Sequence, residues 1–313
     1  MILITGGFGF IGTHVTRALL EAGESCVVAT RRGGPLTHER LVVERVDVTD
    51  RAAFLEIGRR HRITGIVNLV GAFGYGADDP VEDVRLSIAS LVNVLEAARD
   101  WEVPRVGFAS TIGVYLGATG SGPMREDTPL PMTTGHGIPA FKKIGELLGD
   151  HFAAGTGIEI VNYRIAGAWG PGGRPASVFL AAPALVHAAA HGTEPDFTSL
   201  RSPAHADDAA DLIYVKDCAR AIAVLQLAPT LNHRTYNVGG GRATTNAELA
   251  AAITALVPTA RTNLLEGRNP NGLAHDLYLD TTRLRADTGY KPEYDIKQGV
   301  ADYLDWLRAG NPR

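Results

Sequence analysis

A glycine-rich turn follows the first apolar run of the sequence. Gly6, Gly9 and Gly12 stand three residues apart, with Phe10 and Ile11 inside the turn, just before a segment with helical periodicity. The first glycine permits a tight turn, the second lets a pyrophosphate approach the backbone, and the third lets the helix pack closely on the strand. The pattern predicts dinucleotide binding. The alternative is a glycine-rich turn that holds no ligand.

Two further clusters carry side chains that could do chemistry. His187 and His191 lie four residues apart in an apparently helical stretch, so both could face one way. Only alanines stand between them and no third ligand is evident, so we expect no metal site. We interpret Asp207, Asp208 and Asp211 as a solvated loop, with a ligand role as the alternative.

The elements that must position the turn are strands and helices that alternate along much of the chain. Apolar runs that read as strands occupy 1–5, 25–30, 41–48, 65–71, 105–110 and 158–164. Segments with helical periodicity occupy 13–23, 51–61, 81–100 and 139–155. Strands alternating with helices imply right-handed βαβ units. We therefore predict an α/β protein with a doubly wound parallel sheet, a Rossmann fold.

The alternation of strands and helices becomes less regular after about residue 168. We expect helices over 176–192, over 245–257 with Thr245 or Asn246 as N-cap, and over 294–310. The prediction is a dinucleotide-binding domain over 1–168. Residues 169–313 would form mostly a small substrate lobe, with segments around 213–240 returning to the core. Such a lobe would lie over the C-terminal edge of the sheet, where these folds bind ligands.

Composition limits the classes of partner. The chain has 313 residues, 45% hydrophobic and 20% charged, with a formal net charge of −4. That charge argues against nucleic acid or an anionic membrane as partner. The two cysteines, Cys26 and Cys218, fit a reducing compartment. The first strand begins at Met1 and no apolar run is long enough to span a bilayer, so we expect a soluble, cytoplasmic protein.

Several motifs occur in an order that indicates a family. They are TGGFGFIG (5–12), VDVTD (46–50), NLVG (68–71), LVNVLEAAR (91–99), FASTIGVY (108–115), RIAGAWGPGG (164–173), IYVKDCARAI (213–222) and YNVGGG (236–241). Together they resemble the extended short-chain dehydrogenases/reductases, the NAD(P)-dependent epimerase/dehydratase family, over almost the whole chain. The resemblance implies that Asp47 and Val48 contact the adenine, and that Leu69, Val70 and Gly71 run beneath the cofactor.

The resemblance also implies an activity. It predicts an NAD(P)-dependent oxidoreductase or epimerase/dehydratase that acts on a hydroxyl or carbonyl of a sugar-like or other small molecule. A nucleotide sugar is one candidate substrate. Family members that use nucleotide sugars usually have Asn where this chain has Gly167. Arg164, Arg201 and Arg242 could contact an anionic substrate or serve structural roles.

The end of the second strand bears on the choice of nicotinamide. NAD-preferring members carry an acidic side chain there, and this sequence has Thr30 followed by Arg31 and Arg32. Guanidinium groups can bind a 2′-phosphate that a carboxylate would repel. We predict NADP(H), with NAD(H) as the alternative. The alternative without a role in cofactor binding is a solvated basic loop.

The catalytic group of the family is incomplete in this chain. Members use a Ser or Thr that orients the substrate oxygen, a Tyr that moves the proton, and a Lys four residues later that holds the nicotinamide ribose. The resemblance places the orienting hydroxyl at Thr111, with Ser110 beside it. The family often has Glu four residues after the Lys, so Glu146 selects Lys142. The tyrosine position is then Ile138, whose side chain carries no ionisable proton.

Alternatives to this assignment remain open. Choosing Lys143 would place the tyrosine position at Pro139, which carries no proton either. The proton could come from His136, Tyr115 or Tyr75. The reaction could also need no tyrosine, or the chain could be a catalytically silent NADP(H)-binding regulatory protein. A deliberate substitution or a degenerate paralogue is the last explanation.

Two helices have apolar faces wider than packing on one sheet requires. The apolar residues are Val84, Ile88, Leu91, Val92 and Leu95 in the helix from about 82 to 99, and Ala140, Phe141, Ile144, Leu147, Leu148 and Phe152 in the helix from about 139 to 154. In the resembled family the same two helices pair into a dimer interface. We therefore predict a homodimer. The alternative is that these faces sit deeper in the monomer.

Overall fold

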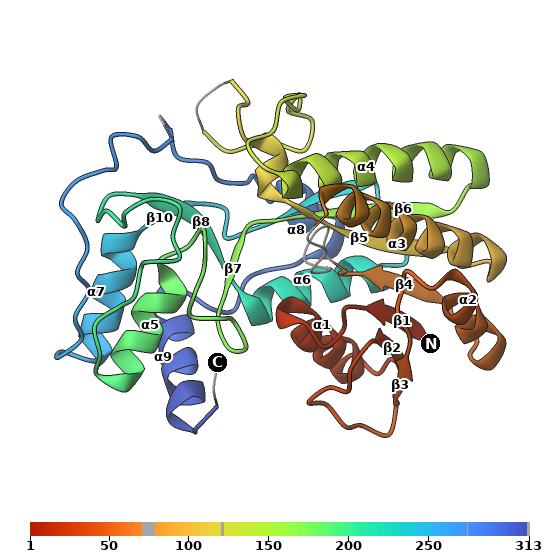
Figure 1. The fold of residues 1–313 in the computed structure, drawn as a ribbon, viewed down its shortest axis with the longest axis horizontal. Helices are drawn as coiled ribbons and strands as arrows, with labels where there is room; N and C mark the ends of the chain where they lie inside the picture. The colour runs from red at the N-terminus through yellow and green to blue at the C-terminus, as the bar shows by residue number, and fades with distance from the viewer. Residues whose placement is uncertain (71–78, 120–121, 274, 312–313) are drawn as a thin grey trace.

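A parallel β-sheet forms the centre of the larger part of the molecule (Figure 1). The computed structural model describes residues 1–70, 79–119, 122–273 and 275–311. Within these residues seven strands share one sheet, in the order β3-β2-β1-β4-β5-β6-β9. Their bounds are β1 Ile2–Thr5, β2 Cys26–Thr30, β3 Leu41–Arg45, β4 Gly65–Asn68, β5 Arg105–Thr111, β6 Glu159–Ile165 and β9 Thr235–Val238.

The pairing of these strands is parallel throughout. The four residues of β1 and of β4 are all buried, as expected of strands covered on both faces. The chain order reverses between β1 and β4, so their carboxyl ends border the crevice where ligands bind in such sheets. The predicted doubly wound α/β fold is confirmed.

Helices cover both faces of the sheet. On one face α1 (Phe10–Glu21) packs against α6 (Val215–Leu227). The other face carries α2 (Arg51–Arg60), α3 (Pro80–Asp100) and α4 (Gly137–Thr156), and α3 lies beside both neighbours. Each layer has its own apolar core, because alternate residues of every strand point to opposite faces. The site elements α3, α4, β4 and β5 therefore pack around one and the same apolar core.

The C-terminal part of the chain adds a second, smaller sheet. β7 (Gly167–Trp169) pairs in parallel with β8 (Ala209–Tyr214), which pairs antiparallel with β10 (Ala243–Thr245). The helices α5 (Ala182–His191), α7 (Asn246–Leu256) and α9 (Ile296–Arg308) pack together against it and form a third apolar core. Figure 1 shows this group to one side of the large sheet.

Of two expected helix starts, one differs from the sequence expectation and the other agrees with it. The helix expected from residue 176 begins only at Ala182, with Pro183 in its first turn, where the missing N–H costs nothing. Thr245, one of the two N-cap candidates, caps α7 in a capping box with Glu248. The remaining short helices are η1 (Ile112–Tyr115) and α8 (Thr282–Thr288).

Both cysteines, Cys26 and Cys218, are buried thiols without a disulfide partner. None of the described helices is both long enough and apolar enough to cross a membrane.

Candidate active site

The glycine turn joins β1 to α1 in a conformation that only small residues permit. Gly6 has a φ of +69°, and its carbonyl accepts a 2.9 Å hydrogen bond from the N–H of Gly9. A Cβ on Gly12 would lie 2.0 Å from that carbonyl oxygen, so helix and turn could not approach as they do. No side chain caps α1 and its first turn holds no acidic residue, which suits binding of an anion. This cradle fits the pyrophosphate of a dinucleotide.

The residues expected to flank the cofactor lie along the same edge of the sheet. A Cβ on Gly6 would meet the backbone of Leu69 and Val70 at 3.2 Å, so the end of β4 borders the turn. The carboxylate of Asp47 accepts hydrogen bonds from the backbone N–H and the hydroxyl of Thr49. Gly71 lies outside the described residues.

At the other side of the turn, the segment after β2 is basic and exposed. The Thr30 hydroxyl donates a 2.7 Å hydrogen bond to the backbone carbonyl of Arg32, which turns the chain at the strand end. Arg31 and Arg32 are both exposed. Arg45 on β3 stands opposite Thr30 in the strand register and adds a third arginine. Sequence reasoning missed Arg45 because only the pairing of β2 with β3 brings it there.

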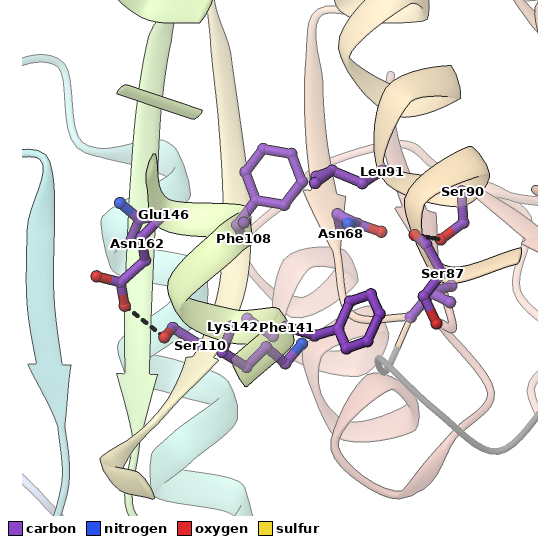
Figure 2. A pocket seen from close by; sticks show the side chains of 13 residues that line it. Asn68, Ser87, Ser90, Leu91, Phe108, Ser110, Phe141, Lys142, Glu146 and Asn162 are labelled. Atoms are coloured by element: carbon purple, nitrogen blue, oxygen red, sulfur yellow. Dashed lines mark hydrogen bonds between the residues drawn. The ribbon is translucent and has the colours of Figure 1, made fainter. Parts of the chain in front are cut away.

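A polar cavity of about 50 Å³ lies between the sheet and the two helices α3 and α4 (Figure 2). It brings together three of the predicted residues, Val70, Ser110 and Lys142, with others that the sequence did not place there. The full lining is Asn68, Val70, Ser87, Ser90, Leu91, Phe108, Ala109, Ser110, Phe141, Lys142, Gly145, Glu146 and Asn162.

The two adjacent lysines of α4 have different surroundings. Lys142 lines the cavity, and burial there lowers the pKa of its ammonium to about 8, although nearby Glu146 acts to raise that pKa. No described residue accepts a hydrogen bond from it. Lys143 instead donates to the backbone carbonyls of Pro131 and Thr133, the latter at 3.1 Å. This geometry favours Lys142 as the functional lysine and gives Lys143 the task of tethering the preceding loop.

Glu146 is held in a buried ion pair. Arg164 on β6 donates to its carboxylate from Nε, at 3.0 Å and 3.2 Å, and from Nη2, at 2.6 Å. Ser110 donates its hydroxyl proton to the same carboxylate. Arg164 therefore has a structural partner and joins β6 to α4. Its Nη1 also donates to the hydroxyl of Tyr115 at 2.7 Å.

That contact argues against Tyr115 as the substitute proton donor. Its hydroxyl donates to Asn237 at 2.8 Å, and burial raises the pKa of Tyr115 to about 12. Tyr75, another candidate, lies outside the described residues. His136 precedes α4, stacks on Phe179 at 5.3 Å between ring centroids and does not line the cavity of Lys142. Burial, and to a lesser extent Arg201, lowers the pKa of His136.

The expected tyrosine position offers no proton. Ile138 lies in the first turn of α4, is 37% exposed and does not line the cavity. Thr111, at the end of β5, accepts a 3.1 Å hydrogen bond from the N–H of Gly113 and so caps η1. Its hydroxyl hydrogen is left to donate elsewhere. Thr111 does not line the cavity that holds Ser110.

A second cavity lies in the smaller part of the molecule. Its lining comprises Val178, Phe179, Leu180, Ala181, Ala182, Leu200, Arg201, Ser202, Pro203, Ala204, Asp208, Ala209, Ala210, Leu212, Thr244 and Asn246. The Arg201 guanidinium stands 4.9 Å from the centroid of the Phe179 ring. The cavity thus offers a cation and an aromatic face.

At Gly167 the structure explains why the usual Asn is missing. A Cβ there would lie 2.8 Å from the backbone oxygen of Asp211, because β7 runs so close to β8. Asp211 itself is buried and accepts hydrogen bonds from the N–H groups of Gly240 and Leu279. The interpretation of this aspartate as part of a solvated loop is therefore wrong.

The histidine pair also has structural partners. His187 forms a 2.9 Å hydrogen bond with the hydroxyl of Tyr303, and His191 one of 2.8 Å with the carbonyl of His187. In the described part of the chain no three His, Cys, Asp or Glu side chains are grouped as metal ligands.

Comparisons with known proteins place this geometry in context. The model of the NAD-dependent epimerase/dehydratase family matches residues 2–239. A UDP-glucose 4-epimerase of Azospirillum brasilense is 28% identical over 334 residues, covering 98% of this chain and 92% of that protein. The Thermotoga maritima UDP-glucose 4-epimerase with UDP-glucose has a TM-score of 0.83 at 21% identity, covering 99% of each chain. The Thermus thermophilus UDP-glucose 4-epimerase complexed with NAD has a TM-score of 0.81 at 24% identity, covering 98% of each chain.

Proposed function

The chain belongs to the NAD-dependent epimerase/dehydratase family of enzymes, and from this we propose that it uses a pyridine nucleotide to transform the sugar of a nucleotide sugar. The observation that carries the proposal is the cradle at the start of α1. There Gly12 approaches the carbonyl of Gly6 more closely than any side chain would allow. When bound, the cofactor accepts and returns a hydride.

Different described residues would hold different parts of such a cofactor. The N–H groups at the start of α1 would hold the pyrophosphate, with Phe10 and Ile11 in that first turn. Asp47 and Val48 would contact the adenine. Lys142 would face the nicotinamide end, because it lines the cavity beside β5 together with Ser110.

We propose NADP(H) as the preferred cofactor. The support is the absence of an acidic side chain at Thr30, together with the exposed guanidinium groups of Arg31, Arg32 and Arg45 around it. Titration calorimetry should give tighter binding of NADPH than of NADH, and added salt should narrow the difference. Replacing Arg31 and Arg32 by Ala, or Thr30 by Asp, should reverse the preference. Equal affinities for the unmodified protein would refute the proposal.

The second cavity is our candidate for the nucleotide half of the substrate. Arg201 offers a charge for a phosphate, and Phe179 offers an apolar contact for a base. Gly167 cannot supply the usual Asn contact, so the sugar must be held by other groups. Arg242 is paired with Glu248 at 3.1 Å and lies outside this cavity, so we assign it no substrate contact.

The test is turnover of a panel of UDP-hexoses and dTDP-hexoses with NADP⁺ or NAD⁺, followed by chromatography of the sugar nucleotides. We expect conversion of at least one member, and Arg201→Ala should raise KM more than it lowers kcat.

Ile138 favours a second function, a catalytically silent NADP(H)-binding regulator, because its side chain carries no ionisable proton. Binding of NADPH without turnover of any sugar nucleotide would favour this second function.

We further propose a homodimer formed through α3 and α4. Val84 and Val92 on α3, and Ile144, Leu147 and Leu148 on α4, are exposed on neighbouring helices. A cytoplasmic location stays our expectation, and the two buried free thiols support it.

A further inference from the structure

Among the described residues lining the cavity of Figure 2, the ionisable side chains are Lys142 and Glu146. Glu146 is occupied, since Arg164 binds both of its carboxylate oxygens and Ser110 donates to one of them. Lys142 is the other group that can gain or lose a proton there. Lys142 also stands one helical turn after Ile138, which occupies the position of the family's tyrosine.

The charged surroundings of Lys142 are few. Glu146 stands one turn further along α4, and Arg164 reaches the same carboxylate from β6. The strands β4 and β5 and the helix α3 present uncharged side chains to the cavity, among them Asn68, Ser110 and Ser87. Because its one acidic neighbour is already neutralised, the amine of Lys142 is not fixed in the charged form, and burial favours the neutral form.

Two unsatisfied polar atoms indicate that the cavity holds water. The hydroxyl of Ser87 and the side-chain oxygen of Asn162 line it, are 5% and 1% exposed by residue, and have no hydrogen-bond partner among the described residues. A volume of about 50 Å³ has room for about three to five waters, at roughly 10–15 Å³ each. Such waters would hydrate the ammonium when Lys142 is charged, so both of its protonation states can exist in place.

We propose that Lys142 is itself the proton-transferring residue of this site, a role that rests on the proposed function. In the oxidation step the O–H bond of a sugar hydroxyl breaks and its proton forms a new N–H bond on the neutral amine. The hydrogen on the same carbon leaves as a hydride to the oxidised pyridine nucleotide, and the C–O bond becomes a carbonyl. In the return step the ammonium gives its proton to the carbonyl oxygen as the hydride comes back.

The first test needs neither cofactor nor substrate. The chain has five lysines, at 142, 143, 216, 291 and 297, so ¹³C-methylation of the amines gives a simple NMR spectrum. The signal that Lys142→Met removes should titrate near pH 8, well below the ordinary value of about 10.4 for a lysine amine. A Lys142 signal that titrates at that ordinary value would overturn the proposal.

The second test separates the proton from the charge. Lys142→Arg keeps a cation for the cofactor but cannot release a proton near neutral pH. It should bind NADPH within about threefold of the unmodified chain and lose roughly 10²–10⁴-fold in kcat. Lys143→Arg is the matched control and should keep its turnover. Turnover by Lys142→Arg at the unmodified rate would overturn the role of Lys142, whereas no turnover by the unmodified chain would overturn the proposed function instead.

Discussion

Two neighbouring lysines on one helix illustrate how the partners of a side chain decide what it can do. Lys142 lines the polar cavity without a hydrogen-bond partner among the described residues, while Lys143 is anchored to backbone carbonyls. Both are lysines in the same helical run, so the sequence separates them only by spacing. The expected difference in function comes from the direction in which each side chain leaves α4.

The first prediction concerns the stability of the cofactor-free protein. Lys142→Met should raise the free energy of unfolding at pH 7 by on the order of 1–3 kcal/mol, because it removes an ammonium whose charged form burial penalises. Lys143→Met should lower that free energy by about 1–3 kcal/mol, because it removes the two tethering hydrogen bonds. Urea denaturation measures both. A destabilised Lys142→Met would contradict the burial argument.

A dependence on pH follows from the same residue. The folded pKa of Lys142, about 8, lies below the unfolded value of about 10.4. Between these values the unfolded chain binds more protons, so this group makes the unfolding free energy rise with pH, by at most about 1.4 kcal/mol per pH unit. Below pH 8 the contribution is constant. The rise should be missing from urea denaturation of Lys142→Met between pH 8 and 10, with Lys297→Met as an exposed-site control.

The tyrosine position gives the next prediction. A phenol introduced by Ile138→Tyr would stand one helical turn before Lys142 and restore the proton donor of the family. The double variant Ile138→Tyr/Lys142→Arg should therefore keep its turnover. The single variant Lys142→Arg, which retains Ile138, should lose its turnover. Kinetics of the single and double variants on one sugar nucleotide measure this. Ile138→Phe supplies the ring without the hydroxyl, and if it rescued Lys142→Arg equally well, the hydroxyl would have no such role.

At the scale of the elements, regular patterns predicted the sheet better than they predicted the lobe. Continuous apolar runs and helical periods gave the strands and helices up to β6 within a few residues, because each is fixed by local burial. The pairing of β7, β8 and β10 depends on contacts between segments far apart in the chain, which no local period records. Arg45 and the cavity of Lys142 escaped prediction for the same reason.

The buried pair between α4 and β6 carries an element-scale prediction. Arg164→Met leaves the carboxylate of Glu146 buried without its cation, so it should cost about 3–5 kcal/mol of unfolding free energy. Adding Glu146→Leu should recover much of that loss, because no uncompensated charge then remains. Arg242→Met is the control, since its exposed pair with Glu248 is worth about 0–1 kcal/mol. Equal losses for Arg164→Met and Arg242→Met in urea denaturation would contradict the argument.

At the scale of the whole molecule, the exposed apolar side chains are unevenly distributed. Val81, Val84 and Val92 on α3 and Ile144, Leu147 and Leu148 on α4 belong to two helices that lie side by side (Figure 1). Exposed apolar side chains that gather on neighbouring helices are a common mark of an interaction site. In a twofold dimer built on these two helices, each copy would bury the same surface of the other.

The last prediction tests that dimer. Leu147 is 63% exposed on α4, so Leu147→Glu should disturb little within one chain. In a dimer it would place two carboxylates in an apolar interface, where burial of unpaired charge is strongly unfavourable. Sedimentation equilibrium at micromolar concentration should give a dimer for the unmodified protein and a monomer for Leu147→Glu. Leu265→Glu, at a 50% exposed leucine between α7 and α8, should stay dimeric. A monomeric unmodified protein would instead mean that these helices face solvent, and the apolar patch would then need another partner.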